Sequence, residues 1–208
     1  MQQVWKIVND NQLLLGVLLG WLFARFWEEL RKPNLELQVG GDGFWPQDTN
    51  PKTKLVHVKV VNSKRNLLKA LFLSSPTANN ARAWVSFLDY ITKTEVVKMN
   101  GRWTSKREPI DYTTGKIDLA EVLIPPRETV PPGEESNISI ALKDDGKQNC
   151  FGFNNESYLH SWRHPDYELI NKRYIVRVKV SAEGKEWTKD FLLQNPGNSL
   201  KQFKLSEL

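Results

Sequence analysis

The chain has 208 residues and a mild formal net charge of +5, with 29 lysines and arginines against 24 aspartates and glutamates. No long run of one sign occurs, so the charge is typical of an ordinary solubilising surface. Cys150 is the single cysteine, which excludes an intramolecular disulfide and agrees with a reducing compartment.

The first predicted element is an apolar helix near the N-terminus. Residues 11–24 carry no charge, but a helix of about 14 residues spans only about 21 Å of a roughly 30 Å hydrocarbon layer. The long stem of Arg25, with Phe26 and Trp27, extends the span to about 17 residues, the low end of the usual range. The side chains predicted to contact lipid are Leu13, Leu14, Leu15, Val17, Leu18, Leu19, Trp21, Leu22, Phe23, Phe26 and Trp27.

Other interpretations of this helix fit less well. A signal peptide needs a small-residue cleavage site, where this chain has WLFARFWEEL, and an amphipathic helix needs a polar face. We therefore predict one transmembrane helix with flanks over residues 1–33. Arg25, Arg31 and Lys32 follow the helix while Lys6 precedes it, which favours a cytoplasmic C-terminal domain.

Residues 34–208 are predicted to form one β-rich domain. Val56, Val58 and Val60 alternate with polar residues, the period of a half-buried strand, and the same pattern recurs along the chain. Glu183-Gly184 predicts a hairpin turn and Asn100-Gly101 another turn. The predicted strands are 35–39, 55–61, 83–88 with 95–99 as its partner, 138–142, and 174–180 paired with 187–193.

Four segments between these strands are harder to assign. Glycines and prolines predict a loop over Gly40 to Thr53, and Lys147 to Leu169 is expected to be irregular. Asn66 to Leu73 is compatible with a helical turn or a strand. Ile117 to Ile124 is expected to be a short strand or hairpin edge.

About seven strands with almost no amphipathic helix indicate an all-β fold, an antiparallel sandwich of immunoglobulin-like type. A domain of this length exceeds the roughly 100 residues typical of that fold, so long loop insertions are expected. Loops of this kind are where a function is most often found.

Several strand sequences resemble a known family. VHVKVVN (residues 56–62), ANNARAWVSFLD (78–89), RYIVRVKV (173–180) and FLL (191–193) resemble strands of bacterial and archaeal immunoglobulin-like modules of the cell-adhesion-related kind. With the helix, GRW (101–103) and GFNNESYL (152–159), the chain resembles prokaryotic membrane-anchored proteins without an assigned activity. Ser63 stands where that pattern usually has glycine. The resemblance implies the fold and leaves the function open.

Three residues are candidate metal ligands: Cys150, His160 and His164. The two histidines have a spacing known from metal-ligand pairs, Cys150 offers a thiolate, and Asp166 is near in sequence. The other interpretation is two exposed loop histidines and a small buried cysteine. Neither a nucleophile elbow nor a phosphate-binding loop accompanies them.

Four residues are candidate partner contacts: Trp45, Arg102, Trp103 and Trp162. Trp45 and Trp162 lie in expected loops, while Arg102 and Trp103 belong to a basic segment. Close to a bilayer, such a segment favours contact with anionic headgroups over nucleic acid.

The sequence thus predicts a single-pass membrane protein whose module interacts with a protein partner without catalysis. A metal-binding enzyme or sensor, and a binder of anionic lipid surfaces, are the alternatives. We expect no cofactor and no nucleic-acid partner.

Overall fold

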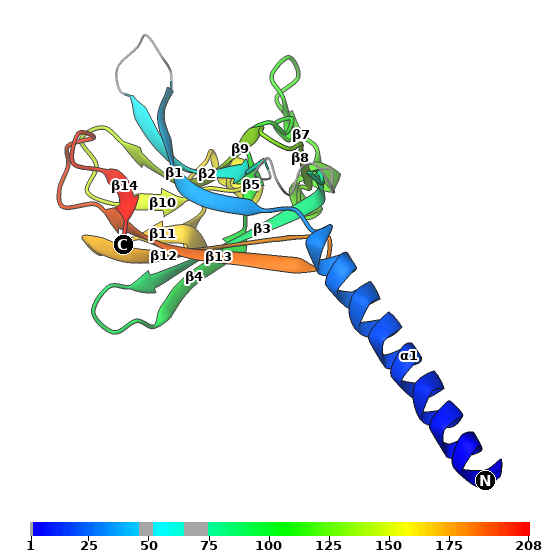
Figure 1. Ribbon diagram of the computed structural model, residues 1–208. Helices are drawn as coiled ribbons and strands as arrows, with labels where there is room; N and C mark the ends of the chain where they lie inside the picture. Colours follow the sequence, from blue (N-terminus) through cyan, green and yellow to red (C-terminus); the bar gives the residue numbers. More distant parts are fainter. Residues whose placement is uncertain (1, 46–51, 65–74) are drawn as a thin grey trace. The chain divides into compact units, whose positions relative to one another are not determined.

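The computed structural model describes residues 2–45, 52–64 and 75–208, with side chains from Leu14 onward. The chain divides into two compact units, and the helix α1 (Gln2–Leu30) lies in a different unit from residues 33–64 and 77–208. Figure 1 draws α1 and the β-rich unit, which are described here separately.

The helix α1 carries its apolar side chains on all sides. Leu18 is 56% exposed and Trp21 63%, and the rings of Phe23 and Trp27 stack with centroids 6.0 Å apart. The side chain of Leu13 lies outside the described residues. Within the described part of the chain, no helix combines the length and apolarity needed to cross a membrane. The helical form is confirmed, whereas this finding does not support the predicted membrane span.

The second unit is a sandwich of two antiparallel sheets, visible as stacked layers in Figure 1. The first sheet has the order β1 (Leu35–Trp45), β2 (Thr53–Asn62), β9 (Glu135–Asp144), β10 (Cys150–Gly152) and β11 (Glu168–Leu169), and β5 (Arg102–Trp103) also pairs with β9. The second has the order β14 (Lys204–Glu207), β13 (Lys185–Gln194), β12 (Arg173–Ala182), β3 (Ala78–Asp89) and β4 (Glu95–Asn100), and β8 (Glu128–Val130) also pairs with β3. The mostly β character, the antiparallel sheets and the strands predicted over 35–39, 55–61, 83–88, 95–99, 138–142, 174–180 and 187–193 are confirmed.

The core lies between the two sheets. Alternate residues of each strand point inward, as the period-two pattern predicts, and each large apolar side chain buried there contributes about 1.5–3 kcal/mol relative to exposure. The inward residues include Leu35, Leu37, Val56, Val58, Val60, Ile138 and Ile140 from one sheet, and Val85, Phe87, Val176, Val178, Val180, Phe191 and Leu193 from the other.

The chain passes between the sheets at Gly101. Asn100 pairs with Trp84 in the second sheet, whereas Arg102 pairs with Ser139 in the first. The Gly101 N–H donates to the carbonyl of Ala83 at 2.8 Å. Asn100-Gly101 is therefore a crossing between layers rather than the predicted turn.

The segment from Gly40 to Thr53, expected to be a loop, is strand at both described ends. β1 continues to Trp45, with a bulge between Val39 and Asp42. Gly40 allows this close pairing, because a Cβ there would lie 2.8 Å from the carbonyl oxygen of His57.

The short strand or hairpin edge expected at Ile117 to Ile124 is confirmed only at Ile117. Only Ile117 belongs to a strand, in the small hairpin of β6 (Ile110–Asp111) and β7 (Lys116–Ile117), and a short helix follows, α3 (Leu119–Leu123). The Asp118 carboxylate accepts hydrogen bonds from the first N–H groups of α3, which stabilises the helix start. The ambiguous segment Asn66 to Leu73 lies outside the described residues.

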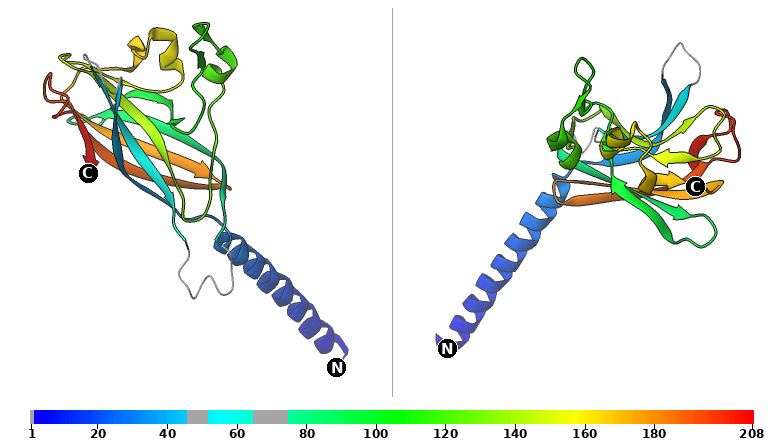
Figure 2. Two further views of the ribbon diagram at one scale, coloured as in Figure 1. Left: turned by 90° about the horizontal axis from the view of Figure 1, so that it is seen from above. Right: turned by 180° about the vertical axis from the view of Figure 1, so that it is seen from behind.

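The stretch from Lys147 to Leu169 is more ordered than expected. Besides β10 and β11 it contains the 3₁₀ turns η1 (Glu156–His160) and η2 (Pro165–Tyr167). Phe153 and Tyr158 form a second small apolar cluster with Leu142. The amide of Asn155 donates to the Glu121 carbonyl at 2.7 Å, and Figure 2 shows the segments around η1 and α3 side by side.

Candidate ligand-binding cleft

An open cleft of about 580 Å³ lies at the end of the sandwich where β1 ends, β2 begins and β9 ends. Residues from the hairpin β6–β7 and from the segment after η1 complete its wall. The described lining residues are Trp45, Lys52, Thr53, Tyr112, Asp144, Asp145, Lys147, Ser161, Trp162 and Arg163. The cleft therefore combines three aromatic rings with charges of both signs.

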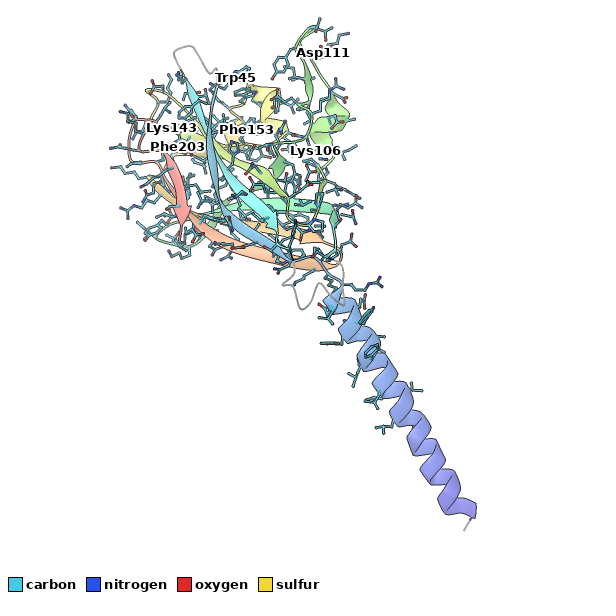
Figure 3. All side chains as sticks on the ribbon, turned by 45° about the horizontal axis from the view of Figure 1, so that its top comes forward. Trp45, Lys106, Asp111, Lys143, Phe153 and Phe203 are labelled. Atoms are coloured by element: carbon cyan, nitrogen blue, oxygen red, sulfur yellow. The ribbon has the colours of Figure 1, made fainter. Side chains whose placement is uncertain are left out.

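The two tryptophans of the cleft contact each other. The ring centroids of Trp45 and Trp162 lie 5.9 Å apart with their planes at 54°. Trp162 also packs edge-on against Phe153 and Tyr158, at 5.7 Å and 6.1 Å. Figure 3 labels Trp45 and Phe153, two of the residues whose rings contact Trp162. Trp162 is thus fixed by its neighbours, while Trp45 is 52% exposed.

The backbone holds Trp162 in an unusual conformation. Ser161 and Trp162 have φ values of 50° and 75°, in the left-handed region that bulky residues rarely adopt. The Trp162 N–H donates to the Ser157 carbonyl at 2.7 Å, and the Arg163 N–H donates to the His160 carbonyl at 3.0 Å. Strain of this kind is maintained by surrounding contacts and is frequent at binding sites.

Arg163 and Asp144 form a bidentate ion pair beside the tryptophans. The Nε and Nη2 atoms of Arg163 donate to the Asp144 carboxylate at 2.5 Å and 2.7 Å. The Thr53 hydroxyl donates to the same carboxylate at 2.6 Å, and Arg163 Nη1 donates to the Ser161 carbonyl at 2.6 Å. Two-point pairing of this kind fixes orientation as well as charge.

These contacts set the protonation of the pair. Burial alone would raise the pKa of Asp144, but hydrogen bonds from Arg163 and Thr53 outweigh it, so the pKa lies below its usual value. The hydrogen bond to Asp144 raises the pKa of Arg163 further. The pair is therefore ionised throughout the neutral range.

Tyr112 forms the rim opposite the ion pair. The ring is 63% exposed and its hydroxyl donates to Glu108. Burial of the hydroxyl and the contact with Glu108 raise the pKa of Tyr112 to about 12. Tyr112 is therefore a neutral aromatic side chain at physiological pH.

The structure brings two of the three candidate metal ligands together, His160 and His164, but Cys150 is not one of a group with them. Cys150 is fully buried in the main core, and burial raises the pKa of its thiol to about 12, which disfavours the thiolate that a metal needs. His160 is exposed, whereas the His164 side chain is only 14% exposed and stacks on Tyr167. The two imidazole centroids lie 4.3 Å apart, and His164 Nδ1 accepts the Asp166 N–H at 3.2 Å. Among the described residues, no three histidine, cysteine, aspartate or glutamate side chains form a group that could hold a metal ion.

Two of the four expected partner contacts lie in the interior. Arg102 is 4% exposed and Trp103 0%, and Arg102 Nη1 donates to the Trp103 carbonyl at 2.8 Å. The basic pattern in this segment reflects a buried strand, so these two side chains are not available to a partner. Trp45 and Trp162, by contrast, meet in the cleft.

Sequence reasoning missed Asp144, Arg163, Thr53 and Tyr112 as lining residues. The strand register is what brings three of the lining residues together, since Thr53 pairs with Asp144 on one side and with Trp45 on the other. That register does not follow from the local sequence pattern.

No protein-family model matches this chain, and no curated protein or solved structure was found to be similar to it.

Proposed function

We propose that this protein is a non-catalytic binding module, an immunoglobulin-like sandwich whose ligand site is the cleft at Trp45 and Trp162, and that α1 anchors it in a membrane. The observation that carries the binding role is the contact of the exposed Trp45 with the partly buried Trp162, beside the bidentate ion pair of Arg163 with Asp144. A concave site with aromatic walls and a few fixed polar groups is the usual form of a ligand pocket.

The strand order supports the immunoglobulin-like part of the proposal. With β1, β2 and β9 taken as strands A, B and E, the short β5 pairs with β9 at the place of strand D. The opposite sheet then has β3, β12 and β13 as strands C, F and G, with β4 flanking β3.

Tyr174 supports the same assignment. It lies at the start of β12, and its hydroxyl accepts the N–H of Asn171 at 2.9 Å. A tyrosine near the start of strand F that bonds to the backbone just upstream is the tyrosine corner of immunoglobulin-like domains. The ring also packs edge-on against Phe87 in the core, at 6.3 Å.

The chemistry of the cleft supports binding rather than catalysis. A general acid near neutral pH needs a raised carboxyl pKa, whereas the pKa of Asp144 is lowered. The same carboxylate is occupied by Arg163 and Thr53, so its oxygens hold the wall of the cleft in place.

The exposed side chains of α1 support the anchoring part. Leu14, Leu18 and Leu22 are each at least 46% exposed, and a helix of this length measures about 43 Å. Trp21, Phe23, Phe26 and Trp27 gather toward its C-terminal end, as aromatic residues do at a membrane boundary. Arg25, Arg31 and Lys32 then place the binding module on the cytoplasmic side in this proposal.

A ligand selection tests the binding role. The full-length chain in a detergent without sugar groups is exposed to a mixed set of displayed peptides, oligosaccharides and nucleotides, beside a Trp45→Ala/Tyr112→Ala variant. Both rings lie at the rim with more than half of their surface exposed, so we expect the variant to fold.

The wild type should retain ligands that the double variant loses. Trp84→Ala is the matched control, because Trp84 lies on β3 in the opposite sheet and is only partly buried. If the wild type and the Trp45→Ala/Tyr112→Ala variant retain the same ligands, or neither retains any, the cleft is not a binding site.

A further inference from the structure

We propose that the cleft binds a neutral saccharide, with a sugar ring stacked on the indole of Trp45 and its hydroxyls bonded to the polar wall. This inference rests on the proposed binding function and names its ligand class. Three features of the cleft lead to it: the balance of charge, the mixture of apolar and polar surface, and the preformed aromatic platform.

The charge of the cleft disfavours a strongly charged ligand. Lys52, Lys147 and Arg163 face Asp144 and Asp145 in one lining, so cations and carboxylates nearly balance. Arg163 is already paired with Asp144 at two points. An anionic ligand would meet Asp145, and a cationic ligand would meet Lys52 and Lys147, so each charged class carries a repulsive contact.

The same groups suit a ligand that both donates and accepts hydrogen bonds. Lysine ammonium groups donate only, an ionised carboxylate accepts only, and the Ser161 hydroxyl can do either. The Thr53 hydroxyl donates to Asp144 and can still accept. The hydroxyl groups of a sugar donate and accept in turn around the edge of the ring. A wall with donors and acceptors interspersed therefore satisfies a polyol better than it satisfies a purely apolar ligand.

The aromatic side of the cleft provides the other half of a sugar site. One face of a pyranose ring consists of C–H groups, which pack against the flat face of an indole, while the ring hydroxyls project from the edge. Trp45 is 52% exposed and leans on Trp162, so one face of the pair is available beside the polar wall. An open cleft of about 580 Å³ has room for one or two such rings.

The platform is held without a ligand. Trp162 is locked by Phe153, by Tyr158 and by its hydrogen bond to Ser157. Because these groups are ordered in advance, binding costs less conformational entropy, which matters for a weak ligand class such as sugars. A proline-rich peptide is the main competitor for an aromatic groove, and the charges of both signs beside the rings make it the poorer fit.

A glycan array tests the ligand class. The full-length chain, in a detergent without sugar groups, is applied to printed neutral oligosaccharides of glucose, mannose, galactose and N-acetylglucosamine, with sulfated glycans and proline-rich peptides on the same array. We expect binding to at least one neutral series and none to the sulfated glycans or the peptides.

The best neutral oligosaccharide is then titrated by calorimetry. We expect a dissociation constant on the order of 1 mM or tighter, weakened at least about tenfold in Trp45→Ala and less than about twofold in Trp84→Ala, with unchanged near-ultraviolet circular dichroism outside the Trp45 contribution. Binding that Trp45→Ala leaves unchanged overturns the proposal.

A preference for sulfated glycans or peptides refutes the neutral saccharide as the ligand and preserves the binding function. The same conclusion follows if no neutral glycan binds while the ligand selection retains another ligand through the cleft. If the array and the selection both find nothing, both proposals fail.

Discussion

Lys143 on β9 places an ammonium group inside the sandwich. The residue has no solvent-exposed surface, and its Nζ donates to the Gln148 carbonyl at 3.0 Å and to the side chain of Asn195. Burial lowers the pKa of Lys143 below the ordinary lysine value of 10.5. Lys54, its pairing partner on β2, donates to the Phe203 carbonyl at 2.7 Å. The two buried lysines therefore hold the segment between β13 and β14 by hydrogen bonds to Asn195 and Phe203.

The lowered pKa of Lys143 gives the free energy of unfolding a pH dependence. Between the folded pKa and 10.5 the unfolded state binds more protons than the folded state, so stability rises with pH in that window. Urea unfolding at about pH 7 and about pH 9.5 should therefore give a more positive change in the free energy of unfolding for the wild type than for Lys143→Met.

Lys98→Met is the matched control, because Lys98 is exposed on β4 and the substitution removes the same charge. The free energy of unfolding of Lys98→Met should change with pH as it does in the wild type. Equal pH dependence in the wild type and Lys143→Met would show that Lys143 titrates normally in the folded state.

The locations of some individual residues could be predicted from the sequence, and those of others could not. Trp45 and Trp162 could be suspected as contacts because large aromatic residues in loops are uncommon without a partner. Arg102 and Trp103 were assigned to the surface because their basic and aromatic pattern is the same for an exposed edge and for a buried crossing strand.

Lys143 is out of phase with the inward residues Ile138 and Ile140, so alternation alone predicts an exposed charge. The irregular register of β9 with β2 breaks that alternation, and Lys143 is buried with hydrogen-bond partners.

At the scale of an element, Gly101 joins β4 of one sheet to β5 of the other. A Cβ at this position would lie 2.6 Å from the Cβ of Ala83 and 3.2 Å from a methyl carbon of Ile138. Ala83 belongs to the second sheet and Ile138 to the first, so the crossing has no room for a side chain.

Gly101→Ala should therefore destabilise the sandwich by about 1–3 kcal/mol, because the strands that flank the crossing must move apart. Gly41→Ala is the matched control, since a Cβ at Gly41 has no atom within 4 Å. Chemical unfolding of both variants measures the difference. A Gly101→Ala variant as stable as Gly41→Ala would mean that the crossing relaxes without cost.

The elements show which physical signals are local. Strands with period-two alternation were predicted well, because one face of each must be buried. The helix α3 was missed because the sequence carries two conflicting signals there. Asp118 caps the start of the helix, whereas the short apolar run that follows is typical of a strand. The extension of β1 beyond Gly40 was missed because glycine is typical of loops, whereas here it permits close approach to His57.

At the scale of the whole molecule, α1 and the sandwich are separate compact units with different surfaces. The sandwich buries a continuous apolar core between its sheets, whereas α1 exposes Leu15, Leu18, Leu19 and Phe23. Exposed apolar surface of this extent usually marks an interaction with a membrane or a partner.

Arginine substitution in α1 tests the anchor. An arginine near the centre of a membrane helix costs about 2.5–3.5 kcal/mol, so Leu18→Arg/Leu19→Arg should move the full-length chain from the carbonate-washed membrane pellet to the supernatant. Glu36→Arg, on an exposed position of β1, is the charge control and should leave the distribution unchanged. Equal pelleting of all three proteins would contradict anchoring by α1.

The arrangement of the strands could not be predicted from the sequence. Most of the cleft could not be predicted either, because it depends on which strands are neighbours. Trp45 and Trp162 meet because β1 pairs with β2, β2 with β9, and the chain after β10 folds back over Leu142. Alternation indicates which residues point inward but not which strands are neighbours. The fold class was therefore accessible from the sequence, and the bidentate pair of Arg163 with Asp144 was not.

The contact between Trp45 and Trp162 also gives the protein a built-in optical reporter. Two indoles with centroids 5.9 Å apart and planes inclined at 54° couple their electronic transitions, which produces paired circular-dichroism bands of opposite sign. Any molecule that inserts between the rings or rotates one of them alters that couplet. Occupancy of the site can therefore be followed spectroscopically in the unlabelled chain.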